Sequence, residues 1–478
     1  MRPRFFAPEN RKWWTLGAVS FALFMIMLDN TVVNVALPSI QRDLGIGLSE
    51  LQWTVNAYAL TFAVLMLTGG KLADFMGRRR VFIIGLAIFT VSSLVCGLAT
   101  SGEMLIAART VQGIGAALMM PATLGIISAT FPVEERGMAI GIWAGVSAMA
   151  LAFGPLVGGL LTEHIHWGWI FFINVPVGVL AIVAARLVIR ESRDTSAEQR
   201  LDLPGLVVSG GALFALVFGL IEASNYGWTS ATILSLFAAA ALGLVAFVLL
   251  ELRQRAPMLD LSLFRNGTFA GANLVAMLVF LAMFGIFFFV SLYMQNVLGY
   301  SPVEAGAVFL PMTVLIMFVA PVSGKLSDRV GSRWLVTGGM TLVGASLLIL
   351  SRLEADSGFW DIFPGLVVGG LGMATVMTPV TAAAIGSVPV AKAGVGSGVL
   401  STFRQVGGAL GIAVMGAIVA SQIHVAPGDP SFVTQFMDGF STALRVAAAI
   451  AFAGALVAAV LIRRYRHFET AELVAEAA

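Results

Sequence analysis

The sequence predicts an all-α polytopic membrane protein with fourteen transmembrane helices. Of its 478 residues, 58% are apolar and only 11% are charged, whereas about 25% are charged in an ordinary soluble domain. The apolar residues form fourteen runs, each close to or above the roughly 20 residues that a helix needs to cross a bilayer. Membrane β-barrels instead consist of short alternating segments. These observations exclude a water-soluble protein.

The predicted spans follow the apolar runs in chain order. The first run comes after Arg11 and Lys12, as a secretory signal would, but its length and the internal Asp29 identify it as a retained helix. The predicted spans cover residues 15–37, 52–72, 81–99, 104–128, 137–161, 167–189, 203–222, 229–250, 268–293, 302–325, 334–351, 360–386, 396–423 and 440–462.

The distribution of basic residues predicts the orientation. Lysine and arginine gather at both ends of the chain and in the loops after the even-numbered spans. Cytoplasmic segments carry this excess, so we expect both termini in the cytoplasm. The single cysteine, Cys96, excludes an intramolecular disulfide, and the four histidines lack partners at metal-ligand spacing. With no nucleotide-binding motif either, we expect no metal, no cofactor, no nucleic-acid partner and no enzymatic activity.

A ten-residue pattern occurs twice and indicates an internal duplication. Its form is G-K-L-x-D-x-x-G-x-R, beginning at Gly70 and again at Gly324, each time at the cytoplasmic end of an even-numbered span. Internal duplication is typical of secondary transporters, whose halves rock about a central site. We predict an N-terminal six-helix bundle (1–200), two inserted helices (201–260) and a C-terminal six-helix bundle (261–478).

Six further segments carry a resemblance to a known family. With the loop pattern, they make the whole chain similar to the fourteen-span drug:proton antiporter branch of the major facilitator superfamily. The resemblance implies the major facilitator fold, a monomer in a bacterial inner membrane, and export of hydrophobic, often cationic drugs or antibiotics in exchange for protons. The segments are residues 28–38, 109–115, 154–159, 171–178, 295–302 and 404–411.

Asp29 and Arg109 are the predicted proton-coupling residues. A carboxylate deep in a span costs about 2.5–3.5 kcal/mol to insert, so it normally faces a cavity and has a partner. A site that is alternately wet and dry would let Asp29 bind and release a proton. Arg109 lies at a similar predicted depth and belongs to a segment that resembles the family's proton-transfer motif. Permanent helix-to-helix hydrogen bonding of Asp29 and snorkelling of Arg109 are the alternatives.

The repeated loop pattern and span 5 supply the predicted conformational gates. In the loops, acidic groups beside arginines form pairs that separate on opening, although simple positive-inside anchoring is the alternative. In span 5, small residues at four-residue spacing permit close helix approach and proline permits bending; ordinary packing would need the same residues. The loop residues are Gly70, Asp74, Gly77, Arg78, Arg79, Gly324, Asp328, Gly331 and Arg333, and the antiporter motif comprises Gly154, Pro155, Gly158 and Gly159.

The predicted substrate cavity takes polar and aromatic residues from several spans. The buried cation Arg404 would meet an anionic group or a helix end, and the phenylalanines of span 9 would form an apolar wall or plain core. The candidates are Asn34, Gln112, Arg404, Phe284 and Phe288. Two alternatives to drug export stay open: proton-coupled transport of an endogenous metabolite, and a non-transporting membrane receptor or scaffold. A proton flux that depends on an added compound distinguishes a transporter of that compound from a receptor, which would show none.

Overall fold

A computed structural model describes residues 8–193, 202–254, 257, 259–388, 393–425 and 429–463. The described residues form helices and no strand, which confirms the all-α prediction. Thirteen helices in this part of the chain are long and apolar enough to cross a bilayer. The fifth predicted span lies in a further helix of 32 residues, some of whose side chains are outside the description. The predicted number of fourteen is therefore close to the thirteen found.

The N-terminal half consists of six predicted spans, the last of which is broken. Its helices are α1 (Pro8–Leu44), α2 (Leu48–Met76), α3 (Arg78–Gly97), α4 (Gly102–Thr130), α5 (Val133–His164), α6 (Trp169–Phe172) and α7 (Asn174–Val188). The break between α6 and α7 comes shortly before Pro176, which cannot donate a backbone hydrogen bond to the preceding turn.

The remaining helices comprise an additional pair and six further spans. The pair is α8 (Leu203–Tyr226) and α9 (Ala231–Arg253), followed by the short 3-10 helix η2 (Leu261–Arg265). The C-terminal half contains α10 (Gly267–Asn296), α11 (Pro302–Val308), α12 (Leu310–Val330), α13 (Ser332–Leu350), α14 (Phe359–Gly386), α15 (Ala393–Gln422) and α16 (Phe432–Leu461). The break between α11 and α12 comes just before Pro311, which again lacks the backbone donor.

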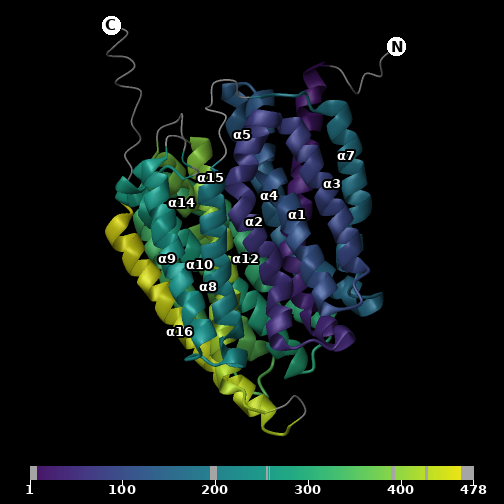
Figure 1. Cartoon of the computed structure of the whole chain (residues 1–478), viewed down its shortest axis with the longest axis vertical. Coiled ribbons are helices and arrows are strands. Elements are labelled where there is room, and N and C mark those ends of the chain that lie inside the picture. The colour runs from purple at the N-terminus through teal and green to yellow at the C-terminus, as the bar shows by residue number, and fades with distance from the viewer. Residues whose placement is uncertain are drawn as a thin grey trace.

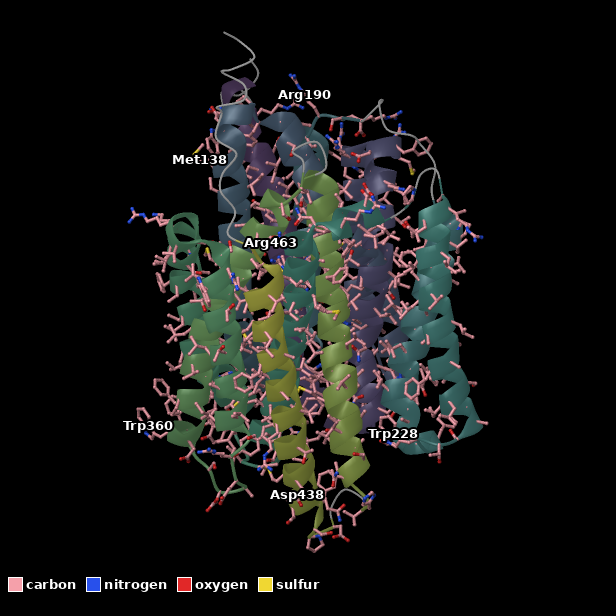
Figure 2. All side chains as sticks on the ribbon, turned by 90° about the vertical axis from the view of Figure 1, so that its left-hand side faces the viewer. Met138, Arg190, Trp228, Trp360, Asp438 and Arg463 are labelled. Carbon is pink, nitrogen blue, oxygen red and sulfur yellow. The ribbon has the colours of Figure 1, made fainter. Side chains whose placement is uncertain are left out.

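The helices run roughly parallel in one elongated bundle, and α1 begins on the face where α16 ends (Figure 1). We call this the terminal face and the opposite one the far face. Arg190 and Arg463 lie toward the terminal face, whereas Trp228, Trp360 and Asp438 lie at the far face (Figure 2). Tryptophans at a helix end are typical of the interface between a bilayer and water.

The two halves meet along four helix pairs, α1 with α10, α2 with α15, α5 with α11, and α5 with α12. The inserted pair packs beside this junction, because α8 contacts both α2 and α15. An apolar cluster of Leu60, Val217, Ile221 and Ala413 joins the three helices. The buried residues of α9 are Ile233, Ala240 and Glu251, so α9 presents most of its surface to the lipid. The predicted domain boundary at 200/201 lies outside the described residues and stays a prediction.

Candidate functional site

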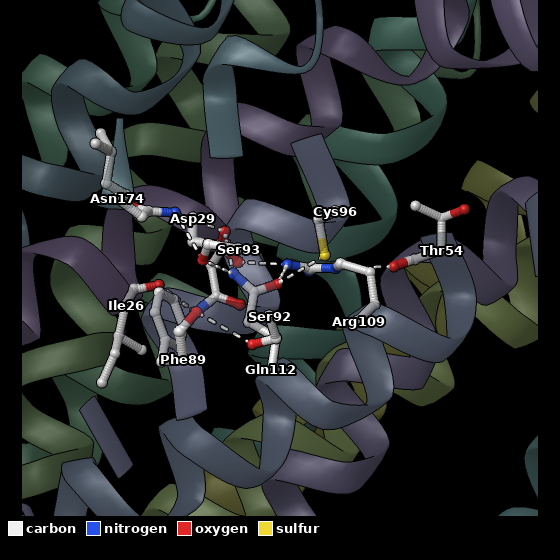
Figure 3. Close-up of polar contacts among 12 residues, drawn as sticks. Ile26, Asp29, Thr54, Phe89, Ser92, Ser93, Cys96, Arg109, Gln112 and Asn174 are labelled. Atoms are coloured by element: carbon white, nitrogen blue, oxygen red, sulfur yellow. Dashed lines mark hydrogen bonds and ion pairs between the residues drawn. The ribbon is translucent and has the colours of Figure 1, made fainter. Parts of the chain in front are cut away.

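A buried ion pair lies inside the N-terminal half (Figure 3). Arg109 of α4 donates from Nη1 to Oδ2 of Asp29 in α1, at 2.5 Å. The two side chains are 1% and 0% exposed, respectively. They were predicted at similar depth from two distant segments, and the structure brings them into contact. Because a buried charge is stable only when it is paired and hydrogen-bonded, the remaining neighbours of the pair decide what it can do.

The second oxygen of Asp29 accepts two amide donors. Gln112 donates from Nε2 to Oδ1 at 3.0 Å, and Asn174 of α7 donates from Nδ2 to the same oxygen at 3.3 Å. Both amides also reach Ser93 Oγ in α3, at 2.8 and 3.5 Å. Both oxygens of Asp29 therefore accept hydrogen bonds from side chains of other helices.

Arg109 has a second set of contacts that do not depend on Asp29. Its Nε donates to the backbone oxygen of Thr54 in α2 at 3.1 Å, and its Nη1 donates to Gln112 Oε1 at 2.7 Å. The Tyr58 ring lies 4.2 Å from Arg109 Cζ and the Phe171 ring lies 5.7 Å away. A guanidinium over an aromatic face gains further attraction. These contacts would hold Arg109 in place when Asp29 is neutral.

The first copy of the loop pattern joins four segments at the terminal face. Asp74 accepts from Nε and Nη2 of Arg78 at 3.0 and 2.8 Å, and Arg78 also donates to the Gly125 carbonyl of α4 at 3.2 Å. Glu191, in the segment after α7, accepts from the backbone amides of Arg79 and Arg80 at the start of α3, at 3.1 and 3.2 Å. An acidic group at a helix N-terminus is favourably placed.

Gly77 and Gly70 give this loop its close packing. Gly77 has φ +110°, a conformation that side chains rarely adopt, and a Cβ there would lie 2.6 Å from Glu191 Cδ. Gly70 faces Pro121 of α4, with 3.5 Å between a Cβ and the ring. Glycine at position 77 is therefore required twice, by backbone geometry and by the approach of Glu191.

The second copy of the pattern keeps the backbone but shows fewer polar contacts. Gly331 has φ +92°, as its counterpart does, and Gly324 packs against Thr378 of α14. Among the described residues, Arg333 forms no ion pair, its buried Nε has no hydrogen-bond partner, and its guanidinium lies 5.0 Å from the Trp334 ring. The side chain of Asp328 is outside the described part, so the predicted second gate stays a prediction.

The glycines of the span 5 motif lie where α5 meets both α1 and the C-terminal half. A Cβ at Gly154 would collide with Thr31, and one at Gly158 would lie 2.7 Å from the Val32 carbonyl oxygen. Gly159 lies against Pro302 of α11, and the carbonyl of Pro155 lies against Gly306 of the same helix. The motif therefore permits backbone-to-backbone contact across the junction. Its role in antiport stays a prediction.

The residues predicted for a substrate cavity do not form one cluster. Gln112 belongs to the Asp29 network. Asn34 is buried, and its Oδ1 has no hydrogen-bond partner among the described residues. Phe284 and Phe288 are buried in the core of α10, packed against Phe280 and Phe289, respectively.

Arg404 is the predicted cavity residue with the least complete set of partners. It donates to Thr381 Oγ1 at 2.5 Å and to the Met377 carbonyl at 3.5 Å, and lies 5.5 Å from the Phe280 ring. No ion pair among the described residues involves Arg404. A substrate contact for any of these residues stays a prediction.

Sequence reasoning assigned no role to several residues of this site. Asn174 and Ser93 complete the network around Asp29, Tyr58 stacks on Arg109, and Glu191 binds the first loop pattern. Asn174 lies in one of the segments that carry the family resemblance, and a polar residue inside an apolar span was the available signal. Glu191 had none, because its contact depends on how α7 ends beside α3.

Comparison with known proteins places these features in a family. The profile described as Major Facilitator Superfamily matches residues 19–202 and 205–412. A tetracenomycin C resistance and export protein of Streptomyces glaucescens is 42% identical over 415 residues, which are 87% of this chain and 77% of that protein. A puromycin resistance protein of Streptomyces alboniger is 37% identical over 465 residues, covering 95% and 92% of the two chains.

Solved structures agree at the level of the fold. A bacterial homologue of the human lysosomal transporter Spinster, in an inward-facing and unoccupied conformation, superimposes with a TM-score of 0.68 at 18% identity, covering 98% of this chain and 100% of that one. At this identity the likeness concerns the fold alone. The profile and the relatives show that this chain belongs to the Major Facilitator Superfamily and is a multi-pass membrane transporter, not an enzyme.

Proposed function

We propose that this transporter exports hydrophobic, often cationic drugs or antibiotics in exchange for protons, with Asp29 as the group that carries the proton. The observation that carries the proposal is the fully buried Asp29–Arg109 pair inside the N-terminal half. The names of its relatives support the cargo class, since they include resistance proteins for puromycin and methylenomycin and an export protein for tetracenomycin C.

The proton would act by changing the contacts of one carboxylate. A proton on Asp29 removes its negative charge, so the attraction of Arg109 is lost and at least one of the three donors around the carboxylate must move. Separating the partners of a buried pair costs about 3–5 kcal/mol, which is why the pair stays closed while Asp29 is ionised. Protonation thus frees α1 to move relative to α4, and release of the proton restores the contact.

The direction of transport follows from the proposed orientation. The terminal face, with Arg190 and Arg463, would lie in the cytoplasm, because basic residues collect on that side. In a bacterial inner membrane the proton gradient points inward, so proton entry would drive cargo outward. The transporter would work as a monomer with no cofactor.

Inverted membrane vesicles test the exchange. Vesicles containing the protein are energised so that their interior becomes acidic, and puromycin or tetraphenylphosphonium is then added. We expect the added compound to release protons from wild-type vesicles and from an Asp43→Asn variant. We expect no release from Asp29→Asn vesicles, because that side chain cannot ionise. Asp43 is a matched control, since it lies in the same helix and is 52% exposed.

Each outcome of this test has a definite meaning. If Asp29→Asn still moves the compound against a gradient at the wild-type rate, Asp29 is not the coupling group. If a panel of such compounds releases no protons from wild-type vesicles while the protein is folded, the chain is not a drug:proton exchanger. Compound-dependent proton release from wild-type vesicles also excludes the receptor alternative.

A further inference from the structure

A second candidate binding site lies at the far face, away from the Asp29 network. A cavity of about 370 Å³ opens there between the start of α2 and the ends of α8 and α15. This volume is within the range of about 300–1,000 Å³ that small-molecule sites occupy. Its lining includes Glu50, Gln52, Ile221, Glu222, Ser224 and Ala420. Three parts of the chain therefore meet at one opening: the N-terminal half, the inserted pair and the C-terminal half.

Two carboxylates give this cavity a negative charge. Glu222 accepts from Ser49 Oγ at 2.5 Å, from Trp53 Nε1 at 3.3 Å and from Asn225 Nδ2 at 2.8 Å. Glu50 accepts from the backbone amide of Gly47 at 2.8 Å. The ion pairs formed by the described residues involve neither glutamate. The hydrogen bonds fix the carboxylates in position without neutralising them.

Gln52 adds an unused acceptor to the same wall. Its side chain is 2% exposed, and its Oε1 has no hydrogen-bond partner among the described residues. Its amide packs against Gly416 of α15. A buried acceptor without a donor is costly, and its partial negative charge adds to that of the two carboxylates in attracting a cation.

The rest of the lining suits the apolar part of an organic molecule. Ile221 and Ala420 line the cavity, and the Trp53 ring beside it lies 5.8 Å from each of the rings of Phe214 and Phe218. No group of three or more acidic, histidine or cysteine side chains among the described residues could hold a metal ion. Acceptors next to apolar surface therefore favour an organic cation over a metal.

We propose that this cavity binds an amphipathic organic cation, such as an ammonium or phosphonium compound, at the far face. Glu222 provides the counter-charge, and Ile221 and Ala420 contact the apolar part. An occupant touches α2, α8 and α15 together, so it binds best when the far ends of the two halves are close. Occupancy thus favours that arrangement. The site also gives the inserted pair a role in binding, and it does not depend on proton coupling by Asp29.

Thiol labelling tests this site directly. The native Cys96 is fully buried, so the Ser224→Cys variant places one accessible thiol on the cavity lining. We expect tetraphenylphosphonium to slow maleimide modification of this thiol in purified protein in nanodiscs. Adding Glu222→Gln should raise the half-protecting concentration about ten-fold, which corresponds to about 1.4 kcal/mol. Adding Glu103→Gln is the matched control, because Glu103 is an exposed carboxylate in the first turn of α4 at the same face.

Three outcomes would overturn the site. In the first, tetraphenylphosphonium protects the thiol equally well in the Glu222→Gln and Glu103→Gln proteins. In the second, the uncharged triphenylphosphine oxide protects the thiol as well as tetraphenylphosphonium does. In the third, tetraphenylphosphonium does not protect the thiol at all. If Glu222→Gln does not fold, Glu50→Gln is substituted and must weaken protection. Protection should persist in Asp29→Asn, so loss of proton exchange and loss of this site are separable; protection that disappears with Asp29→Asn contradicts an independent site.

Discussion

The N-terminal and C-terminal halves share an architecture but differ in how they hold their charges. Arg109 in the first half is 1% exposed and is paired with Asp29 inside a shell of amide donors. Arg404 in the second half has two neutral hydrogen-bond acceptors and no ionic partner among the described residues. The two halves thus share the tight glycine turns of the repeated pattern, while among the described residues the buried acid–base pair is found in the first half. We infer that proton coupling takes place in the N-terminal half.

The largest expected effect comes from breaking the buried pair. Arg109→Gln leaves Asp29 ionised and buried without its cation, which costs about 3–5 kcal/mol. Arg404→Gln leaves no acid unpaired, and the loss of its hydrogen bonds costs about 1 kcal/mol. Thermal unfolding of the purified proteins in one detergent compares the two variants.

The control for this comparison is the double variant Asp29→Asn/Arg109→Gln. It carries neither charge, so it should regain most of the stability that Arg109→Gln loses, while proton exchange stays absent. Equal unfolding temperatures for Arg109→Gln and Arg404→Gln would contradict the proposed difference between the halves.

An intermediate effect is expected at the glycine turns. Gly77→Ala and Gly331→Ala each force alanine into a positive φ, at about 1–3 kcal/mol. Gly77→Ala should cost more, because its methyl group also meets Glu191 Cδ. The unfolding temperature of Gly77→Ala, measured with and without Glu191→Ala, separates the effect of the positive φ from that of the contact with Glu191. If Glu191→Ala does not reduce the cost of Gly77→Ala, backbone geometry alone requires the glycine.

The smallest effect is expected from the loop arginines. The Arg78–Asp74 pair is partly exposed, with 20% and 41% of the two side chains accessible, so its loss in Arg78→Gln costs about 1 kcal/mol or less. Arg333→Gln removes no ion pair seen among the described residues and should cost less still. The export rate and the unfolding temperature check both variants, and a larger cost for Arg333→Gln would show that the second gate is the stronger one.

The sequence predicted the helical fold well because lipid imposes long apolar runs and duplication leaves a readable repeat. It also suggested the contact of Asp29 with Arg109, since a buried charge needs a partner at the same depth. It did not predict the amide shell of Gln112 and Asn174 around that pair, because which faces of α4 and α7 turn toward α1 is decided by packing. For the same reason it could not place Glu222 and Gln52 on one cavity, as they come from helices far apart in the chain.

The backbone contacts between α5 and α11 have a consequence for how such a transporter can change over generations. Gly159 against Pro302, and Pro155 against Gly306, bring the two halves together at the far side through main-chain atoms. The contact between the halves at that place therefore places few constraints on the side chains that bind the cargo. Substitutions that alter the cargo can accumulate elsewhere while this contact between the halves is retained.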